Sequence, residues 1–130
     1  MIPHRRSRLV AIVQVCLALG LLVLTGCGTA ELSEVPAELL GTWRIDAPGY
    51  ERSYLEIAPR RFVIGMGSFE LYDYAIDRIE TDTDRSGDRI VELHYTAEAG
   101  YPDKLVLIVD QHATDTFTLG SRSQTWVRDS

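Results

Sequence analysis

Apolar and polar residues alternate along much of the chain after residue 40, with the two-residue period of a β-strand. Leu55 and Ile57, for example, alternate with Tyr54 and Glu56. The segments between such stretches are rich in Gly, Pro, Asp and Ser, which favour turns, and none of the chain here keeps a helical period. The pattern predicts eight strands, over residues 41–46, 53–58, 61–65, 69–79, 89–96, 104–110, 114–119 and 123–128.

These strands predict an all-β fold in one domain. Eight antiparallel strands in so short a chain protect their edges by closing into a small barrel or by packing as a two-sheet sandwich. Residues 105–109 are apolar on both faces, which indicates a strand that is covered on both sides. Pro36 is suited to begin one helical turn over residues 35–40. We expect a small antiparallel eight-stranded barrel over residues 39–130.

The N-terminal segment has a different pattern, in which a basic opening precedes an apolar run. Arg5, Arg6 and Arg8 come before residues 9–24, which carry no charged side chain. That run is shorter than the roughly 20 residues that a helix needs to cross the hydrocarbon of a bilayer. A basic opening followed by a short apolar run is typical of a secretory signal peptide, here predicted as a helix within residues 1–26.

The next residues, Leu24-Thr25-Gly26-Cys27, resemble the lipobox of bacterial lipoproteins. In that family the signal is cut before the Cys, whose thiol carries diacylglycerol and whose amine carries a further acyl chain such as palmitate. The resemblance implies cleavage between Gly26 and Cys27, lipid modification of Cys27, and a tether over residues 27–38. The alternative is a permanent N-terminal membrane anchor with a chance Cys at its end.

Cleavage at this point changes the charge and the chemistry of the remaining chain. It leaves 104 of the 130 residues and removes three of the 13 basic residues, so 10 basic residues face 19 acidic ones and the net charge is −9. Such a domain repels nucleic acid and anionic headgroups, so we expect the lipid to hold it on the membrane and expect no nucleic-acid partner. Cys16 leaves with the signal and Cys27 is acylated, so no thiol remains for a disulfide or a nucleophile.

Gly28 follows the expected lipidated residue, where an Asp commonly retains lipoproteins at the inner membrane of Gram-negative cells. Because Gly28 stands in place of that Asp, the sequence resembles lipoproteins that take the default route to the outer membrane, where the domain faces the periplasm. In a cell envelope with one membrane, the outer leaflet of that membrane is the expected location.

The two ends of the expected barrel resemble the lipocalin and lipocalin-like (calycin-type) pattern. The first strand begins Leu40-Gly41-Thr42-Trp43, and the last ends Thr125-Trp126-Val127-Arg128. In that family a Gly-x-Trp opens the first strand after a helical turn, and an Arg from the far end of the barrel packs over the Trp. The resemblance implies that Gly41 and Trp43 begin the barrel and that Arg128 stacks on the indole, sealing an apolar interior.

An acidic segment over residues 82–88 is the chain's candidate for a metal site. Its oxygen-bearing side chains have the spacing of the first half of an EF-hand calcium loop, but Leu93 stands where that loop has its bidentate Glu. The flanking segments are expected strands rather than helices, so a solvated hairpin turn is the favoured interpretation and no metal cofactor is expected. The candidate ligands are Asp82, Asp84, Ser86 and Asp88.

The remaining polar residues do not form a recognisable catalytic motif. After loss of His4, His94 and His112 remain, and neither has metal-ligand spacing to the other. A site built on Glu92 and His94 would need further partners, so an exposed cross-strand His is favoured. The sequence has no Gly-x-Ser-x-Gly, phosphate-binding or zinc-protease motif, and we expect no enzymatic activity and no cofactor. Catalysis would require polar side chains to converge inside the barrel.

Tyrosines crowd several of the expected strands. At a barrel mouth they would hold a small apolar or amphipathic ligand, since each offers a flat face and one polar tip. Core filling is the alternative, favoured by the narrow interior of eight-stranded barrels. The ligand-lining candidates are Tyr54, Tyr72, Tyr74 and Tyr95. We expect a non-catalytic binding module for such a ligand, the alternative being a protein-interaction lipoprotein, an inhibitor or an envelope-assembly accessory, with a solid core.

Replacing Cys27 with Ser removes the thiol on which lipidation depends. The Cys27→Ser protein is expected to keep its signal peptide and to lack added acyl mass, because a hydroxyl does not replace the thiol in the lipid-transfer step. Whole-protein mass spectrometry of envelope fractions measures both features. Cys16→Ser is the matched control and is expected to be cleaved and acylated like the parent. A Cys27→Ser protein that is processed and acylated would contradict the prediction.

Overall fold

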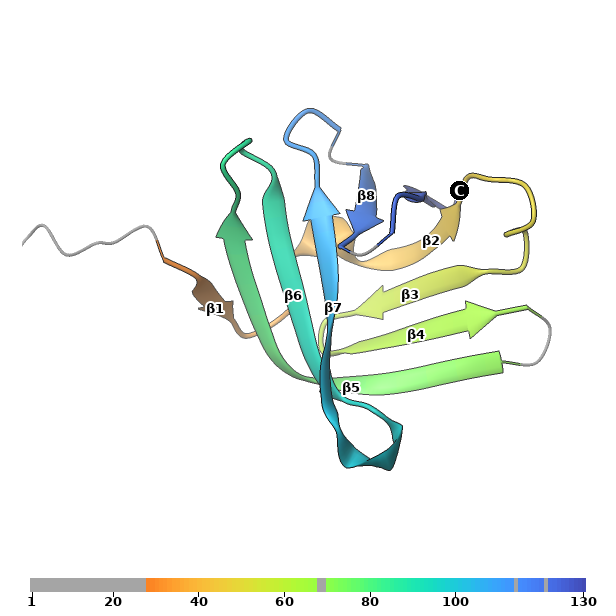
Figure 1. Ribbon diagram of the computed structural model, residues 1–130, viewed down its shortest axis with the longest axis horizontal. Helices are drawn as coiled ribbons and strands as arrows, with labels where there is room; N and C mark the ends of the chain where they lie inside the picture. The colour runs from red at the N-terminus through yellow and green to blue at the C-terminus, as the bar shows by residue number, and fades with distance from the viewer. Residues whose placement is uncertain (1–27, 68–69, 114, 121) are drawn as a thin grey trace, which may run out of the picture.

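Eight antiparallel strands close into a barrel, and a ninth strand, β1 (Ala30–Leu32), pairs with one of them (Figure 1). The computed structural model describes residues 28–67, 70–113, 115–120 and 122–130. The signal peptide expected over residues 1–26 and the lipidation expected at Cys27 lie outside these described residues. Within the described part, no helix has the length and apolar character that crossing a bilayer requires.

The barrel strands form an up-and-down meander, in which each strand pairs with the next one in the chain. The eight strands are β2 (Gly41–Ile45), β3 (Tyr54–Ala58), β4 (Arg61–Met66), β5 (Glu70–Thr83), β6 (Arg89–Thr96), β7 (Pro102–Val109), β8 (Thr116–Leu119) and β9 (Thr125–Arg128). Pairing of β9 with β2 closes the ring. There are also two short 3-10 helices among the described residues. η1 (Ala37–Leu39) precedes the first barrel strand, and η2 (Glu98–Gly100) lies in the connection between β6 and β7.

The long strand β5 bends, so that its two halves serve different neighbours. Residues 70–75 pair with β4, whereas the following residues pair with β6 and, at residues 79–81, with β1. The register shifts between Ile76 and Arg78, and such a bulge increases the local bend and twist of a strand. The side chain of Arg60 donates to the main-chain oxygen of Ile76 at 3.3 Å and to that of Ser33 at 2.6 Å, which holds β1 beside the bend. In Figure 1, β5 runs beside β4 and then turns to run beside β6.

Alternation within each strand decides which side chains face the interior. In β6, for example, Val91 and Leu93 are completely buried, while Glu92 and His94 between them lie on the outer face. Among the described residues, every buried side chain is apolar, and no polar or charged residue is buried. The core comprises Val35, Leu39, Trp43, Leu55, Ile57, Phe62, Ile76, Ile79, Val91, Leu93, Leu107, Val109, Phe117 and Trp126.

The pairing of β2 with β9 places Trp43 opposite Arg128 and seals one end of the barrel. The guanidinium carbon of Arg128 lies 4.3 Å from the centroid of the Trp43 ring, over its face. The indole is completely buried and donates to the main-chain oxygen of Leu39 at 3.0 Å. Arg128 also donates to the main-chain oxygens of Glu38 and Leu40, each at 2.6 Å. These contacts tie the last strand to η1 and to the first barrel strand.

Two separate features of this seal require a glycine at position 41. Its φ of +116° lies in a region that side chains with a Cβ rarely adopt. A Cβ at this position would also stand only 3.0 Å from Nη1 of Arg128. The Gly-x-Trp pattern therefore has a physical basis here, because the glycine makes room for the guanidinium that covers the tryptophan.

The structure confirms the expected all-β class and the antiparallel eight-stranded barrel, but several strand limits differ. β5 continues to Thr83, four residues past its expected end, because Thr81, Asp82 and Thr83 still pair with β6. β7 begins at Pro102, which stands at the first position of the strand, where a missing N–H is tolerated. The segment expected as a tether contains β1, whose three residues find an open edge on β5.

Loss of the Arg128 side chain is expected to lower the free energy of unfolding by about 1–3 kcal/mol, because a cation–π contact and two charge-assisted hydrogen bonds disappear. Urea denaturation of Arg128→Ala measures this change. Arg128→Lys should restore only part of the loss, since an ammonium group lacks the fork that reaches both carbonyls. Arg85→Ala, in an exposed turn, is the control and should change stability by less than about 0.5 kcal/mol. Equal effects of Arg128→Ala and Arg85→Ala would contradict this account.

Candidate functional site

The barrel encloses a cavity of about 720 Å³ that is partly open to solvent. Its volume falls within the range of small-molecule sites, roughly 300–1,000 Å³. The cavity lies at the other end of the closing strands from the Trp43 seal, since Ile45 at the end of β2 and Trp126 in β9 both line it. Most of the lining is apolar and comes from Ile45, Leu55, Ile64, Met66, Leu105, Val106, Ile108, Leu119 and Trp126. The barrel therefore has one sealed end and one hollow end.

Polar groups line the cavity at the strand ends and in the connecting loops. Tyr50 and Ser53 come from the β2–β3 connection, and Arg122 from the β8–β9 connection. Asp103 and Lys104 come from the start of β7. Charges of both signs thus stand beside an apolar interior, an arrangement that suits a molecule with a nonpolar body and a polar end.

Tyr95 connects the cavity wall to this polar region. Its ring packs 4.6 Å from the ring centroid of Tyr74 and 5.0 Å from that of Phe62. Its hydroxyl donates to Oδ2 of Asp103 at 3.2 Å. Burial, followed by the negative charge of Asp103, raises the pKa of Tyr95 to about 12, so the phenol is neutral at physiological pH.

Tyr95 is the one of the four tyrosines proposed from the sequence that lines the cavity; the other three lie elsewhere. Tyr74 packs 5.4 Å from Phe62 and its ring stacks on Tyr72 at 6.4 Å, so both belong to an aromatic cluster in the barrel wall. Tyr54 lies on the outer face, where its ring occupies the space that a Cβ at Gly65 would take. The lining is therefore mainly aliphatic, and of the four candidate tyrosines only Tyr95 contributes to it.

Tyr50 and Trp126 are lining residues that the sequence analysis did not assign to the cavity. Tyr50 lies in a loop, outside any alternating pattern, and its hydroxyl accepts a hydrogen bond from Nε2 of Gln124 at 3.1 Å. Trp126 was considered only as part of the last strand's end motif. Alternation along β9 was the available signal, because it places Trp126 on the face opposite to Val127, and the larger aromatic side chain is the one that faces inward.

The acidic segment over residues 82–88 forms a hydrogen-bonded hairpin turn. One carboxylate oxygen of Asp84 accepts from the Ser86 amide at 2.9 Å, the Ser86 hydroxyl at 2.6 Å and the Asp88 amide at 3.0 Å. The Ser86 hydroxyl bond is the main reason that the pKa of Asp84 is lowered. Gln111 donates to the Ser86 main-chain oxygen at 2.8 Å. Asp84 thus binds its own turn, and Asp82 binds the amide of Thr83.

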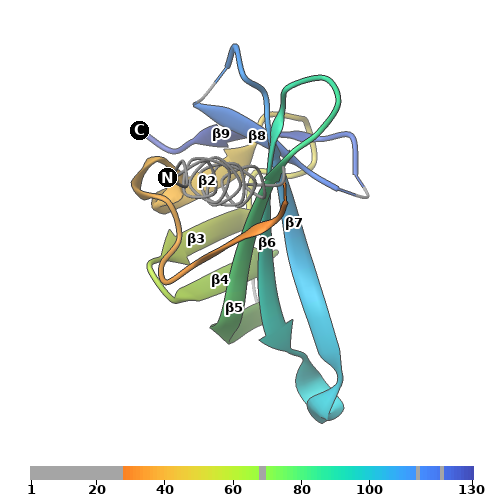
Figure 2. The ribbon, with the colours of Figure 1, turned by 90° about the vertical axis from the view of Figure 1, so that its left-hand side faces the viewer.

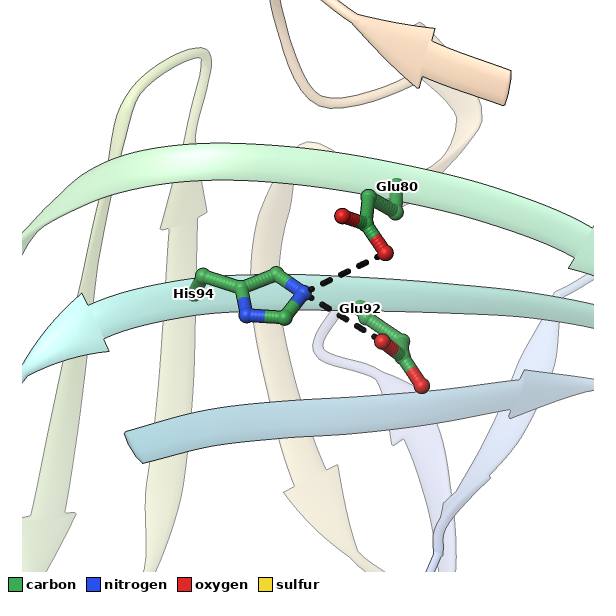
Figure 3. Close-up of side chains that lie close together, drawn as sticks. All are labelled: Glu80, Glu92 and His94. Atoms are coloured by element: carbon green, nitrogen blue, oxygen red, sulfur yellow. Dashed lines mark ion pairs between the residues drawn. The ribbon is translucent and has the colours of Figure 1, made fainter. Parts of the chain in front are cut away.

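A different group, formed by Glu80, Glu92 and His94, brings together atoms that could hold a metal ion. One potential ligand atom from each residue lies within 4.8 Å of the other two (Figure 3). Glu92 and His94 are close in sequence, whereas Glu80 lies 12 residues before Glu92 and becomes its neighbour only through the β5–β6 register, which the sequence pattern does not predict.

Comparison with known proteins returned no match of this chain to any protein-family model, curated protein or solved structure.

The phenol of Tyr95 should ionise well above the ordinary pKa of a tyrosine, which is about 10. Ultraviolet titration near 295 nm is expected to show a transition at about pH 12 that Tyr95→Phe removes and that Tyr101→Phe, at an exposed position, leaves in place. Because the raised pKa disfavours the phenolate in the folded state, the stabilisation from neutral Tyr95 should be complete below about pH 10 and decline toward pH 12. Persistence of the late transition in Tyr95→Phe would contradict the assignment.

Proposed function

We propose that this protein is an envelope-anchored, non-catalytic, lipocalin-like lipoprotein that binds a small apolar or amphipathic ligand. The half-open cavity of about 720 Å³ with a mainly apolar lining is the observation that carries this proposal. An eight-stranded barrel filled entirely by side chains would have no such space. Transfer of a nonpolar molecule from water to this lining would release water from both surfaces, which favours binding.

The position of the polar groups favours an amphipathic ligand over a purely apolar one. Its nonpolar body would lie against Leu55, Ile64 and Leu105. Its polar end would meet Asp103 and Arg122 beside the opening, where water also reaches. A charged end that remains partly hydrated loses little solvation on binding, so these rim groups would orient the ligand without a large desolvation cost.

The anchoring part of the proposal rests on the lipobox-like Leu24-Thr25-Gly26-Cys27 and the preceding apolar run. A lipid on Cys27 would leave only two residues between the anchor and the start of β1. The Trp43 seal lies near η1, which follows β1 after residues 33–36, whereas the cavity lies at the opposite ends of β2 and β9. The cavity would therefore be reached from the aqueous side of the envelope.

A protein-interaction lipoprotein is the second candidate, and exposed apolar side chains favour it. Leu71 and Tyr101 are 62% and 72% exposed, and Met66 at the cavity edge is 42% exposed. In the described pairings, residues 70–75 of β5 are joined to β4 alone. A sheet edge with apolar neighbours is suited to pair with a strand of another protein.

Filling the cavity separates the two candidates. The fluorescent probe N-phenyl-1-naphthylamine is expected to bind the parent protein, and Ile64→Trp should weaken that binding roughly tenfold or more by occupying the cavity. Val63→Trp is the matched control, since the neighbouring side chain points to the outer face and should leave affinity within about twofold of the parent. Thermal unfolding of each variant verifies its fold.

Native mass spectrometry of protein purified from cell envelopes provides an independent measurement. A co-purified small molecule that is lost in Ile64→Trp and kept in Val63→Trp would support the proposal. Absence of both probe binding and a bound molecule in the parent would overturn it and favour the protein-interaction candidate.

A further inference from the structure

A cluster of charged side chains lies on the outer face of the barrel, on strands β5, β6 and β7. Glu80 lies opposite Glu92 in the β5–β6 register, and Arg78 lies opposite His94. His94 in turn lies opposite Lys104 of β7. Adjacent inward positions on the same strands, Ile79 and Leu93, belong to the core. Glu80, Glu92 and His94 are not among the residues that line the cavity, although Lys104, which pairs with Glu92, is.

The Nε2 atom of His94 points toward both glutamates yet forms a hydrogen bond with neither. It lies 3.2 Å from Oε2 of Glu92 and 3.6 Å from Oε2 of Glu80. This nitrogen is shielded from solvent and has no hydrogen-bond partner. In Figure 3 the two carboxylates lie on different sides of the ring nitrogen. A shielded polar atom without a hydrogen bond is costly, and either ion pairs with a protonated ring or a metal ion between the two carboxylates would offset that cost.

In each glutamate a cation holds one oxygen, and the other oxygen faces His94. Nε of Arg78 lies 2.7 Å from Oε1 of Glu80, and Nζ of Lys104 lies 3.0 Å from Oε1 of Glu92. The two Oε2 atoms face the imidazole. The side chains of Glu80, Glu92 and His94 are only 22–24% exposed, whereas Arg78 and Lys104 are about half exposed.

The register across three strands also concentrates negative charge here. Glu31 of β1 lies opposite Glu80, which lies opposite Glu92, so three carboxylates form one cross-strand row. Like charges in directly opposed positions destabilise a sheet. Arg78 on β5 and Lys104 on β7 offset part of this repulsion through their ion pairs with Glu80 and Glu92. The space between the two Oε2 atoms has no cation of its own among the described side chains.

We propose that Glu80, Glu92 and His94 form a binding site for a divalent transition-metal ion such as Zn²⁺. For Zn²⁺ bonds of about 2.0–2.1 Å to nitrogen and oxygen, the ligand atoms at the corners of a tetrahedron are about 3.3–3.4 Å apart. The two distances from Nε2, 3.2 and 3.6 Å, are close to that separation. Three protein ligands leave a fourth position for water, as in open zinc sites.

The donor set selects the class of ion. An imidazole nitrogen with two carboxylates suits Zn²⁺, Co²⁺ or Ni²⁺. Ca²⁺ takes six to eight oxygen ligands, and the two available Oε2 atoms supply too few of them. The row of carboxylates would add long-range attraction for a divalent cation in the surrounding solvent.

Arg78 is the residue that opposes metal binding, and it provides a sharp test. A ring that binds metal through Nε2 carries its proton on Nδ1, and Nη2 of Arg78, which can only donate, lies 3.5 Å from that atom. Metal binding therefore requires Arg78 to turn toward solvent, which its half-exposed position allows. Replacing Arg78 with Gln removes both this opposing donor and a positive charge beside the ion, so it should strengthen metal binding.

Isothermal titration calorimetry of the full chain purified in detergent, with ZnCl2 as the probe, tests the site. The parent is expected to bind one Zn²⁺. His94→Gln should abolish detectable binding, and Glu80→Gln or Glu92→Gln should weaken it roughly tenfold or more, whereas Arg78→Gln should strengthen it about threefold or more. Visible absorption of the Co²⁺ form gives a second measurement, because His94→Gln should remove the tetrahedral Co²⁺ bands.

Two control variants locate the binding. His112→Gln, which removes an exposed loop His, and Asp84→Asn, in the acidic turn, should leave both titration and spectrum unchanged. Circular dichroism verifies that each variant is folded, and the outer-face position of the three ligands makes this the expected result. Absence of Zn²⁺ binding by the parent, or binding that His94→Gln leaves intact, would overturn the proposal. Weaker Zn²⁺ binding in Arg78→Gln would contradict the opposing role assigned to Arg78.

Discussion

Closure of the first barrel strand on the last is the constraint on which the rest of the structure depends. The β2–β9 pairing joins residues more than 80 positions apart, and Arg128 strengthens it by covering Trp43 and binding two carbonyls of the segment around η1. An open meander of these strands would expose two unpaired edges and much of its apolar face. The closed ring instead surrounds an interior that is filled at the Trp43 end and hollow at the other end.

Because β5 bends, its two halves pair with different strands of the barrel wall. Its first half continues the sheet through β4, and its second half turns to meet β6 and accepts β1. Because residues on one strand alternate between faces, the same stretch of β5 and β6 supplies Ile79 and Leu93 to the core and Glu80 and His94 to the outer surface. A barrel wall of this kind can carry an apolar site on one face and an ionic cluster on the other, and here Lys104 belongs to both.

The limits of β5, the presence of β1 and the position of Tyr54 differ from what we expected from the sequence, and each difference has a physical reason. The end of β5 was placed four residues early because Asp82 and Thr83 are turn-forming residues, yet pairing with β6 keeps them extended. β1 was missed because a three-residue strand has no period of its own and exists only through the open edge of β5. Tyr54 was considered for the cavity although its neighbour Leu55 faces inward, and alternation alone places it outside.

The sequence by itself determined the all-β class, the number of barrel strands and most of their inward faces, because these follow from local alternation and turn chemistry. It also indicated, through resemblance, that Gly41, Trp43 and Arg128 belong together. Only the tertiary structure decided that the interior stays hollow at one end and that Glu80 stands beside Glu92 and His94. The physical reason is that cavity volume and cross-strand register depend on how distant strands are aligned, and a shift of one residue would move every one of these side chains to the opposite face.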